Sequence, residues 1–177
     1  MQKNKRLLSV VYTAVFAALI AAMTSQIKFS TGINEGYLHF GDSMIYLASC
    51  VLPLPYALAA AAIGGATADI LAGAAIWAVP TATIKILNAL PFALVFALKK
   101  TNQPKKMLNI YTGFMPILSG LITVFGYLLA EGLMYTFPTA WASVPISCIQ
   151  AVGSAIIYYI AALALDKLNF KSKMYRL

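Results

Sequence analysis

Charged residues are scarce in this sequence, and acidic residues are the scarcest of them. Asp, Glu, Lys and Arg together make up 10% of the 177 residues, and only five of these are acids. Soluble domains carry about 25% charged residues, whereas 61% of this chain belongs to the hydrophobic class. A soluble domain of this size could not bury so many apolar side chains in one core. The composition therefore excludes a soluble protein and indicates an integral membrane protein.

The residues from which metal sites and catalytic centres are built are also few. There is one histidine, His39, and the two cysteines, Cys50 and Cys148, lie far apart within apolar runs. A metal site needs a cluster of such ligands, and cysteines in apolar runs are typical of small core residues. The chain contains no HExxH, GxSxG, Walker A or Rossmann motif. We therefore expect no metal, no cofactor and no enzymatic activity.

Apolar segments along the chain predict an all-α integral membrane protein with six transmembrane helices in a single domain, residues 1–177. A spanning helix needs about 20 residues, so the length leaves room for about six spans and short loops. The second apolar segment ends at Pro53 and Pro55, which break a helix, so we expect that span to be short or shielded. The predicted spans cover about residues 7–25, 41–52, 55–76, 80–98, 108–135 and 143–165. We expect a loop at about residues 137–141.

Basic residues outnumber acidic ones by 13 to 5, which gives a net charge of +8. Most of them fall in three clusters that flank apolar segments, at residues 3–6, 99–106 and 167–176. Lys and Arg are enriched on the cytoplasmic side of membrane proteins. The clusters therefore predict that both termini and the loop at 99–106 are cytoplasmic. We expect the basic residues to lie beside the lipid bilayer, and we expect no binding to nucleic acid.

Polar side chains within the predicted spans indicate where a ligand binds, because polar groups in lipid are costly. Lys85 lies inside a span, so topology does not explain its charge. It has two interpretations: an ion pair with Asp69 or Glu131, or a donor that faces a ligand. Helical spacing places polar residues of three spans on facing stripes in the external half. These stripes predict an outward cavity lined by Thr81, Lys85, Asn88, Glu131 and Gln150, with Trp77, Tyr127, Tyr135 and Trp141 near its rim.

Some of these polar and aromatic residues have structural interpretations as well. The aromatic residues are also expected in an interfacial belt. Asp69 shares a stripe with Gly65 and Gly73, which predicts a buried acceptor at a close helix contact, or else a ligand contact. Asp42 is expected at the N-cap or in the first turn of its helix. His39 is a candidate donor in a loop that covers the cavity.

The first predicted helix carries alanine at every fourth position, at Ala14, Ala18 and Ala22. Such a smooth face allows another helix to approach closely. The face packs within the bundle or docks to a separate membrane subunit.

Four segments carry a resemblance to a known family: TAVFAALIAA, GYLHFGDSMIYLA, LPLPYALAAAAIGGATADILAG and WAVPTATIKILNALPF. Through them the chain resembles, over essentially its full length, a substrate-binding S component of an energy-coupling factor (ECF) vitamin transporter. The resemblance implies a bacterial cell-membrane protein that binds its vitamin in an outward cavity. It also implies association with one membrane coupling subunit and two cytoplasmic ATPases, and toppling in the membrane to release the substrate.

The same resemblance assigns roles to two parts of this chain. The gate would be residues 28–40, including Tyr37 and His39, and the coupling-subunit interface would be the face of Ala14, Ala18 and Ala22. The branch is similar to those for vitamin B6 and hydroxymethylpyrimidine, so pyridoxine, pyridoxal or pyridoxamine is the expected substrate.

The expected substrate contacts of the vitamin B6 interpretation involve two charged residues. Lys85 would meet a phenolate oxygen of the vitamin, and Glu131 would accept from a ring N–H. Hydroxymethylpyrimidine, a queuosine precursor and niacin are alternatives. A stand-alone secondary transporter and a structural membrane subunit are alternatives of another class.

Overall fold

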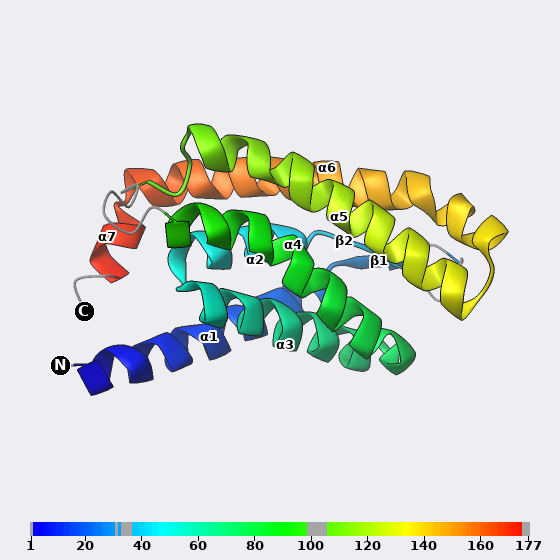
Figure 1. The fold of residues 1–177 in the computed structure, drawn as a ribbon, viewed down its shortest axis with the longest axis horizontal. Helices are drawn as coiled ribbons and strands as arrows, with labels where there is room; N and C mark the ends of the chain where they lie inside the picture. The colour runs from blue at the N-terminus through cyan, green and yellow to red at the C-terminus, as the bar shows by residue number, and fades with distance from the viewer. Residues whose placement is uncertain (1, 31, 33–36, 99–105, 175–177) are drawn as a thin grey trace.

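A computed structural model describes residues 2–30, 32, 37–98 and 106–174 of the chain. Long helices lie side by side along the length of the molecule, and successive helices alternate in direction (Figure 1). The helices are α1 (Gln2–Ser25), α2 (Asp42–Val51), α3 (Leu54–Ala72), α4 (Ala78–Leu98), α5 (Ile110–Met134), α6 (Phe137–Lys167) and α7 (Phe170–Met174), with a 3-10 turn, η1 (Ala75–Trp77). Two short strands, β1 (Lys28–Ser30) and β2 (Tyr37–His39), complete the described fold.

Five helical segments are long and apolar enough to cross a membrane: α1 from Arg6 onward, α3, η1 together with α4, α5 and α6. This confirms the all-helical membrane fold. The segment that was expected to be short or shielded is α2, which has ten residues, about half of what a span needs. α2 packs against α1, α3, α4 and α6, and nine of its ten residues are buried. It is therefore the central element of the bundle.

The polar stretch between α1 and α2 forms an antiparallel hairpin. Lys28 pairs with His39, and Ser30 pairs with Tyr37. The hairpin lies toward the end of the bundle opposite the start of α1 (Figure 1). Residues 31 and 33–36 of the predicted gate lie outside the described residues.

The last spanning helix begins earlier than the sequence indicated. Residues 137–141 were expected to form a loop, and they form the first turns of α6. The Thr136 side chain accepts a hydrogen bond from the Thr139 backbone N–H, and Pro138 lies in the first turn. Both features favour a helix start, because an N-cap oxygen satisfies an unpaired amide and proline needs no donor there.

The outer surface of the bundle is apolar, as expected for helices in lipid. On α5, the side chains of Phe114, Leu118, Phe125 and Leu129 are exposed, whereas the buried positions include threonines, a serine and a glutamate. The polar side chains of this spanning helix therefore gather inside the bundle.

The two cysteines were both expected in the core. Cys50 is buried, whereas Cys148 is exposed on α6.

Small residues let α1, α3 and α4 pack closely. A Cβ added at Gly64 of α3 would lie 2.8 Å from the carbonyl oxygen of Ala17 on α1, and one at Gly65 would lie 2.9 Å from Lys85 Cγ on α4. Ala17 and Ala21 of α1 are buried in this contact. The neighbouring row of Ala14, Ala18 and Ala22 is exposed. The alanine face that packs in the described bundle is therefore the row of Ala17 and Ala21.

We predict that Gly64→Ala destabilises the protein by about 1–3 kcal/mol, because the added methyl group overpacks the contact between α1 and α3. The Cβ would lie 2.7 Å from Ile20 Cβ. The matched control is Gly113→Ala in α5, where a Cβ meets nothing within 4 Å and alanine favours the helix. Thermal unfolding in detergent should show a lower Tm for Gly64→Ala only, and equal Tm values for both variants would contradict the close packing.

Candidate functional site

A buried ion pair lies at the centre of the bundle. Lys85 Nζ on α4 is 2.5 Å from Asp42 Oδ1 at the start of α2, and the two side chains are 1% and 0% exposed. Thr123 Oγ1 on α5 and Gln150 Nε2 on α6 both donate to Asp42 Oδ2, each at 3.4 Å. One carboxylate therefore connects α2 with three spanning helices.

The observed partner of Lys85 corrects one of the two sequence interpretations, the ion pair with Asp69 or Glu131. Asp42 does lie in the first turn of α2, as expected, but its oxygens bond to other helices. The physical reason is the position of α2 inside the bundle, which brings its first turn beside α4. A buried lysine without this partner would be strongly destabilising.

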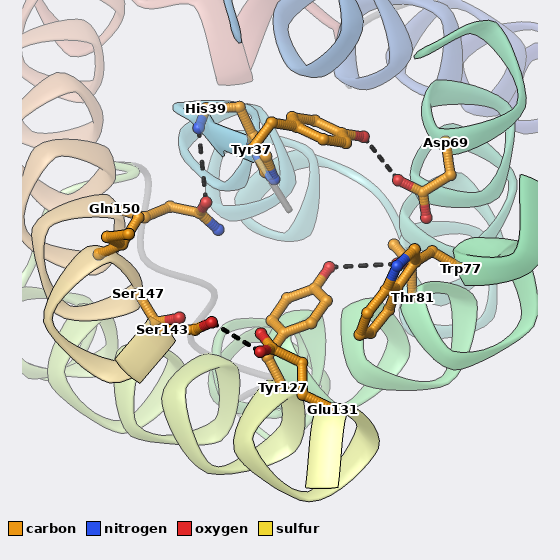
Figure 2. Close-up of a pocket in the computed structure, with 11 residues that line it drawn as sticks. Tyr37, His39, Asp69, Trp77, Thr81, Tyr127, Glu131, Ser143, Ser147 and Gln150 are labelled. Carbon is orange, nitrogen blue, oxygen red and sulfur yellow. Dashed lines mark hydrogen bonds between the residues drawn. The ribbon is translucent and has the colours of Figure 1, made fainter. Parts of the chain in front are cut away.

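Next to this pair, the described residues form a cavity of about 550 Å³, its open part included. Side chains from β2, α3, η1, α4, α5 and α6 converge on it (Figure 2). The lining residues are Tyr37, His39, Asp69, Trp77, Thr81, Tyr127, Glu131, Ser143, Ile146, Ser147 and Gln150.

Most of the predicted substrate-binding residues lie together in this lining: Tyr37, His39, Trp77, Thr81, Tyr127, Glu131 and Gln150. Lys85 and Asn88 are not part of it. Lys85 is engaged by Asp42, and Asn88 Nδ2 donates to Thr123 Oγ1 at 2.7 Å. Both are buried polar groups that connect helices.

Several lining residues were not among the predicted ligand contacts. Ser143, Ile146 and Ser147 lie on the same face of α6 as Gln150, so the helical spacing is the signal that could have found them. Asp69 was interpreted as structural and also lines the cavity. Both tryptophans were predicted near the rim of the cavity. Trp77 is buried in the lining, whereas Trp141 is not part of the lining and is 61% exposed.

Hydrogen bonds between elements hold the hairpin and one wall of the cavity in place. Tyr37 Oη donates to Asp69 Oδ1 at 2.5 Å, and Lys28 Nζ donates to the Ala72 carbonyl oxygen at 3.1 Å. Both bonds tie the hairpin to the last turn of α3. On the opposite side, the His39 backbone N–H donates to Gln150 Oε1 at 3.4 Å. Figure 2 shows the Tyr37 and His39 bonds on two sides of the cavity.

The other walls of the cavity are also connected between helices. Thr81 Oγ1 and Tyr127 Oη lie 3.2 Å apart, and Ser143 Oγ donates to Glu131 Oε2 at 2.6 Å (Figure 2). The Trp77 ring packs near Tyr127, with ring centroids 6.0 Å apart. Aromatic groups of this kind give a flat apolar surface with polar edges. The cavity therefore offers aromatic surface together with several hydrogen-bonding groups.

The described lining contains two carboxylic acids, Asp69 and Glu131, and its histidine and the tyrosine beside Asp69 are neutral. Burial and the nearby Lys85 lower the pKa of His39 to about 3, so the imidazole is neutral at physiological pH. Its Nδ1 accepts from the Gly41 N–H at 3.1 Å. Burial and Asp69 raise the pKa of Tyr37, so its hydroxyl keeps the proton that it donates. The described lining contains no lysine or arginine, and Asp42 compensates the nearby Lys85.

The described residues contain no group of three or more His, Cys, Asp or Glu side chains placed to hold a metal ion. The site consists of aromatic rings, hydroxyls, an amide and two carboxylates. These groups can bind and orient a small molecule by hydrogen bonds and stacking.

Comparison with protein families gives a match over most of the chain. The profile described as "ECF-type riboflavin transporter, S component" matches residues 4–167. The chain belongs to this family. A search of curated proteins found no match. Family membership makes the chain a multi-pass transporter subunit and not an enzyme, which agrees with a binding cavity inside a helical membrane bundle.

We predict that Lys85→Met destabilises the protein by about 3–5 kcal/mol, because it leaves the Asp42 carboxylate buried without its counter-ion. Asp42→Asn in the same chain should recover most of this loss, since the amide carries no charge. The Tm values of wild type, both single variants and the double variant in detergent test this coupling. A double variant that is no more stable than Lys85→Met would contradict it.

Proposed function

We propose that this chain is the vitamin-binding S component of an ECF-type importer in a bacterial cytoplasmic membrane. It binds one flat heterocyclic vitamin in the cavity between the hairpin and the spanning helices. A membrane coupling subunit and two ATPase subunits supply the energy for uptake. Family membership supports the role, and the cavity with its aromatic and polar lining is the observation that carries it.

The proposed topology has six passes with both termini in the cytoplasm. In this proposal α2 makes the return pass between α1 and α3, although it has only ten residues, because the helices around it shield it from lipid. α1 begins and α7 ends at the same end of the bundle (Figure 1). Lys167, Lys171 and Lys173 lie at that end, and basic residues favour the cytoplasmic side. In this arrangement the cavity opens on the opposite, outer side.

Electrostatics narrow the class of vitamin. The described lining carries Asp69 and Glu131, and the nearby lysine is neutralised by Asp42. An uncharged or cationic heterocycle is therefore favoured over an anion such as niacin. We favour riboflavin, because the matching family is described as a riboflavin transporter component.

Vitamin B6 is the second candidate. Pyridoxine is also a flat heterocycle that is uncharged or cationic, and Glu131 in the lining can accept from its ring N–H. The expected contact of Lys85 with a phenolate oxygen is not part of this proposal, since Lys85 is bonded to Asp42. Hydroxymethylpyrimidine and a queuosine precursor fit the same charge but have no further support.

The two tryptophans provide a matched test of the site. Trp77 lies in the cavity wall, whereas Trp141 lies on the outer surface of α6. We predict that Trp77→Ala weakens vitamin binding at least tenfold, because it removes aromatic surface of the cavity, and that Trp141→Ala changes the affinity less than twofold. Calorimetric titration of the purified chain with riboflavin and with pyridoxine measures both effects. Equal effects of the two substitutions would contradict the proposed site.

The exposed row of Ala14, Ala18 and Ala22 is the proposed docking face for the coupling subunit. These side chains are not covered by the described parts of the chain, and small residues permit close contact between membrane helices. The neighbouring Ala17 and Ala21 already pack within the bundle, so the two rows have separate roles in this proposal.

We predict that Ala18→Trp prevents assembly with the coupling subunit and leaves vitamin affinity unchanged, because the bulky ring blocks helix approach on α1, which contributes no residue to the described lining. Leu19→Trp is the control, since Leu19 is also exposed on α1 and carries a large side chain already. Co-purification with the coupling complex and vitamin uptake by vesicles are the measurements. Full uptake by Ala18→Trp would contradict the docking face, and uptake by the chain without ATPases would favour a stand-alone secondary transporter.

A further inference from the structure

Two buried polar atoms in the cavity lining have no hydrogen-bond partner in the described structure: Trp77 Nε1 and Asp69 Oδ2. The two residues are 5% and 4% exposed. Leaving a buried donor or acceptor unsatisfied costs about 1–3 kcal/mol. The other buried side-chain atoms without partners, such as Tyr46 Oη and Ser154 Oγ, belong to residues outside the lining. Two residues of the lining thus carry one donor and one acceptor without a partner.

Both atoms belong to the same corner of the fold. Asp69 lies in the last turn of α3, and η1 follows directly after Gly73 ends that helix in the left-handed conformation, with φ +84°. The Ala74 N–H donates to the Asp69 carbonyl oxygen at 2.8 Å, and the Trp77 N–H donates to the Ala74 carbonyl oxygen at 2.9 Å. Figure 2 shows both side chains on the same wall of the cavity.

Neighbouring groups fix the orientation of both side chains. Tyr37 Oη occupies Asp69 Oδ1 at 2.5 Å, so Oδ2 is the carboxylate oxygen left for another donor. The Trp77 ring is held between two tyrosines, with its centroid 6.0 Å from that of Tyr127 and 6.1 Å from that of Tyr135. Such preorganised groups add specificity, because a ligand that cannot pair with them leaves them buried and unsatisfied.

We propose that Trp77 Nε1 donates to a carbonyl oxygen of the ligand and that Asp69 Oδ2 accepts from the adjacent ligand N–H. The site then recognises the lactam or imide edge of a heterocycle. This inference rests on the proposed function and names the chemical class of the vitamin. Riboflavin carries such an edge, since its N3–H lies between two carbonyl groups, whereas pyridoxine has no amide edge.

The test compares riboflavin with 3-methylriboflavin, in which a methyl group replaces the N3 hydrogen. Flavin fluorescence quenching by the full purified chain in detergent gives both affinities. We expect wild type to bind riboflavin more than tenfold tighter than the methylated flavin, because the carboxylate oxygen loses its donor. Equal affinities in wild type would overturn the inference.

Three variants assign the two contacts separately. Asp69→Ala should bring the affinity ratio of the two flavins close to one. Ser147→Ala is the control, because it removes another hydroxyl of the lining and leaves Asp69 and Trp77 in place, so it should preserve the ratio. Trp77→Phe keeps an aromatic ring and removes the donor, so it should weaken riboflavin at least tenfold and also preserve the ratio. A ratio that survives in Asp69→Ala would overturn the role of Asp69, and unchanged riboflavin binding by Trp77→Phe would overturn that of Trp77.

The outcomes separate this inference from the proposed function. Riboflavin binding without discrimination against the methylated flavin overturns the inference and leaves the S-component role intact. Binding of pyridoxine in place of riboflavin does the same. If the chain binds neither riboflavin nor pyridoxine, the proposed substrate classes fail and the inference fails with them.

Discussion

A lysine and an aspartate buried between apolar helices must satisfy each other, and much of this bundle follows from that requirement. The bond between Lys85 and Asp42 places the start of α2 against α4, while Thr123 and Gln150 bring α5 and α6 to the same carboxylate. Since breaking a buried pair is far more costly than any surface contact, α2 is held at the centre of the bundle. A helix of ten residues can occupy this position because other helices surround it.

The same pair determines the electrostatics of the cavity beside it. Gln150 bonds to Asp42 through Nε2 and to the His39 backbone through Oε1, so the central pair, α6 and the hairpin are connected by one side chain. With Lys85 neutralised, the acids Asp69 and Glu131 dominate the described lining. The proposed ligand is accordingly an uncharged or cationic heterocycle that brings hydrogen-bond donors. Recognition then depends on the fixed geometry of the walls more than on attraction between charges.

The sequence predicted the features that arise from local periodicity. The membrane class follows from composition, and the helical spacing brought most of the lining residues together, including Gln150 and Glu131. The partner of Lys85 could not be predicted, because it depends on where the interior helix α2 lies. Asp69 bonds to Tyr37 and also lines the cavity. This arrangement could not be predicted either, because it depends on where the hairpin lies. The helical start at Phe137 did have a local signal in Thr136 and Pro138, which the loop interpretation did not use.

Native mass spectrometry of the detergent-purified chain, incubated with a mixture of riboflavin, pyridoxine and niacin, tests the central claim most directly. The chain alone, without coupling or ATPase subunits, should retain one vitamin molecule, with the mass of riboflavin as the predicted addition. Retention of niacin would contradict the electrostatic account, because an anion would then occupy a cavity lined by acids. A chain that retains none of the three vitamins would contradict the claim that this cavity is a vitamin-binding site.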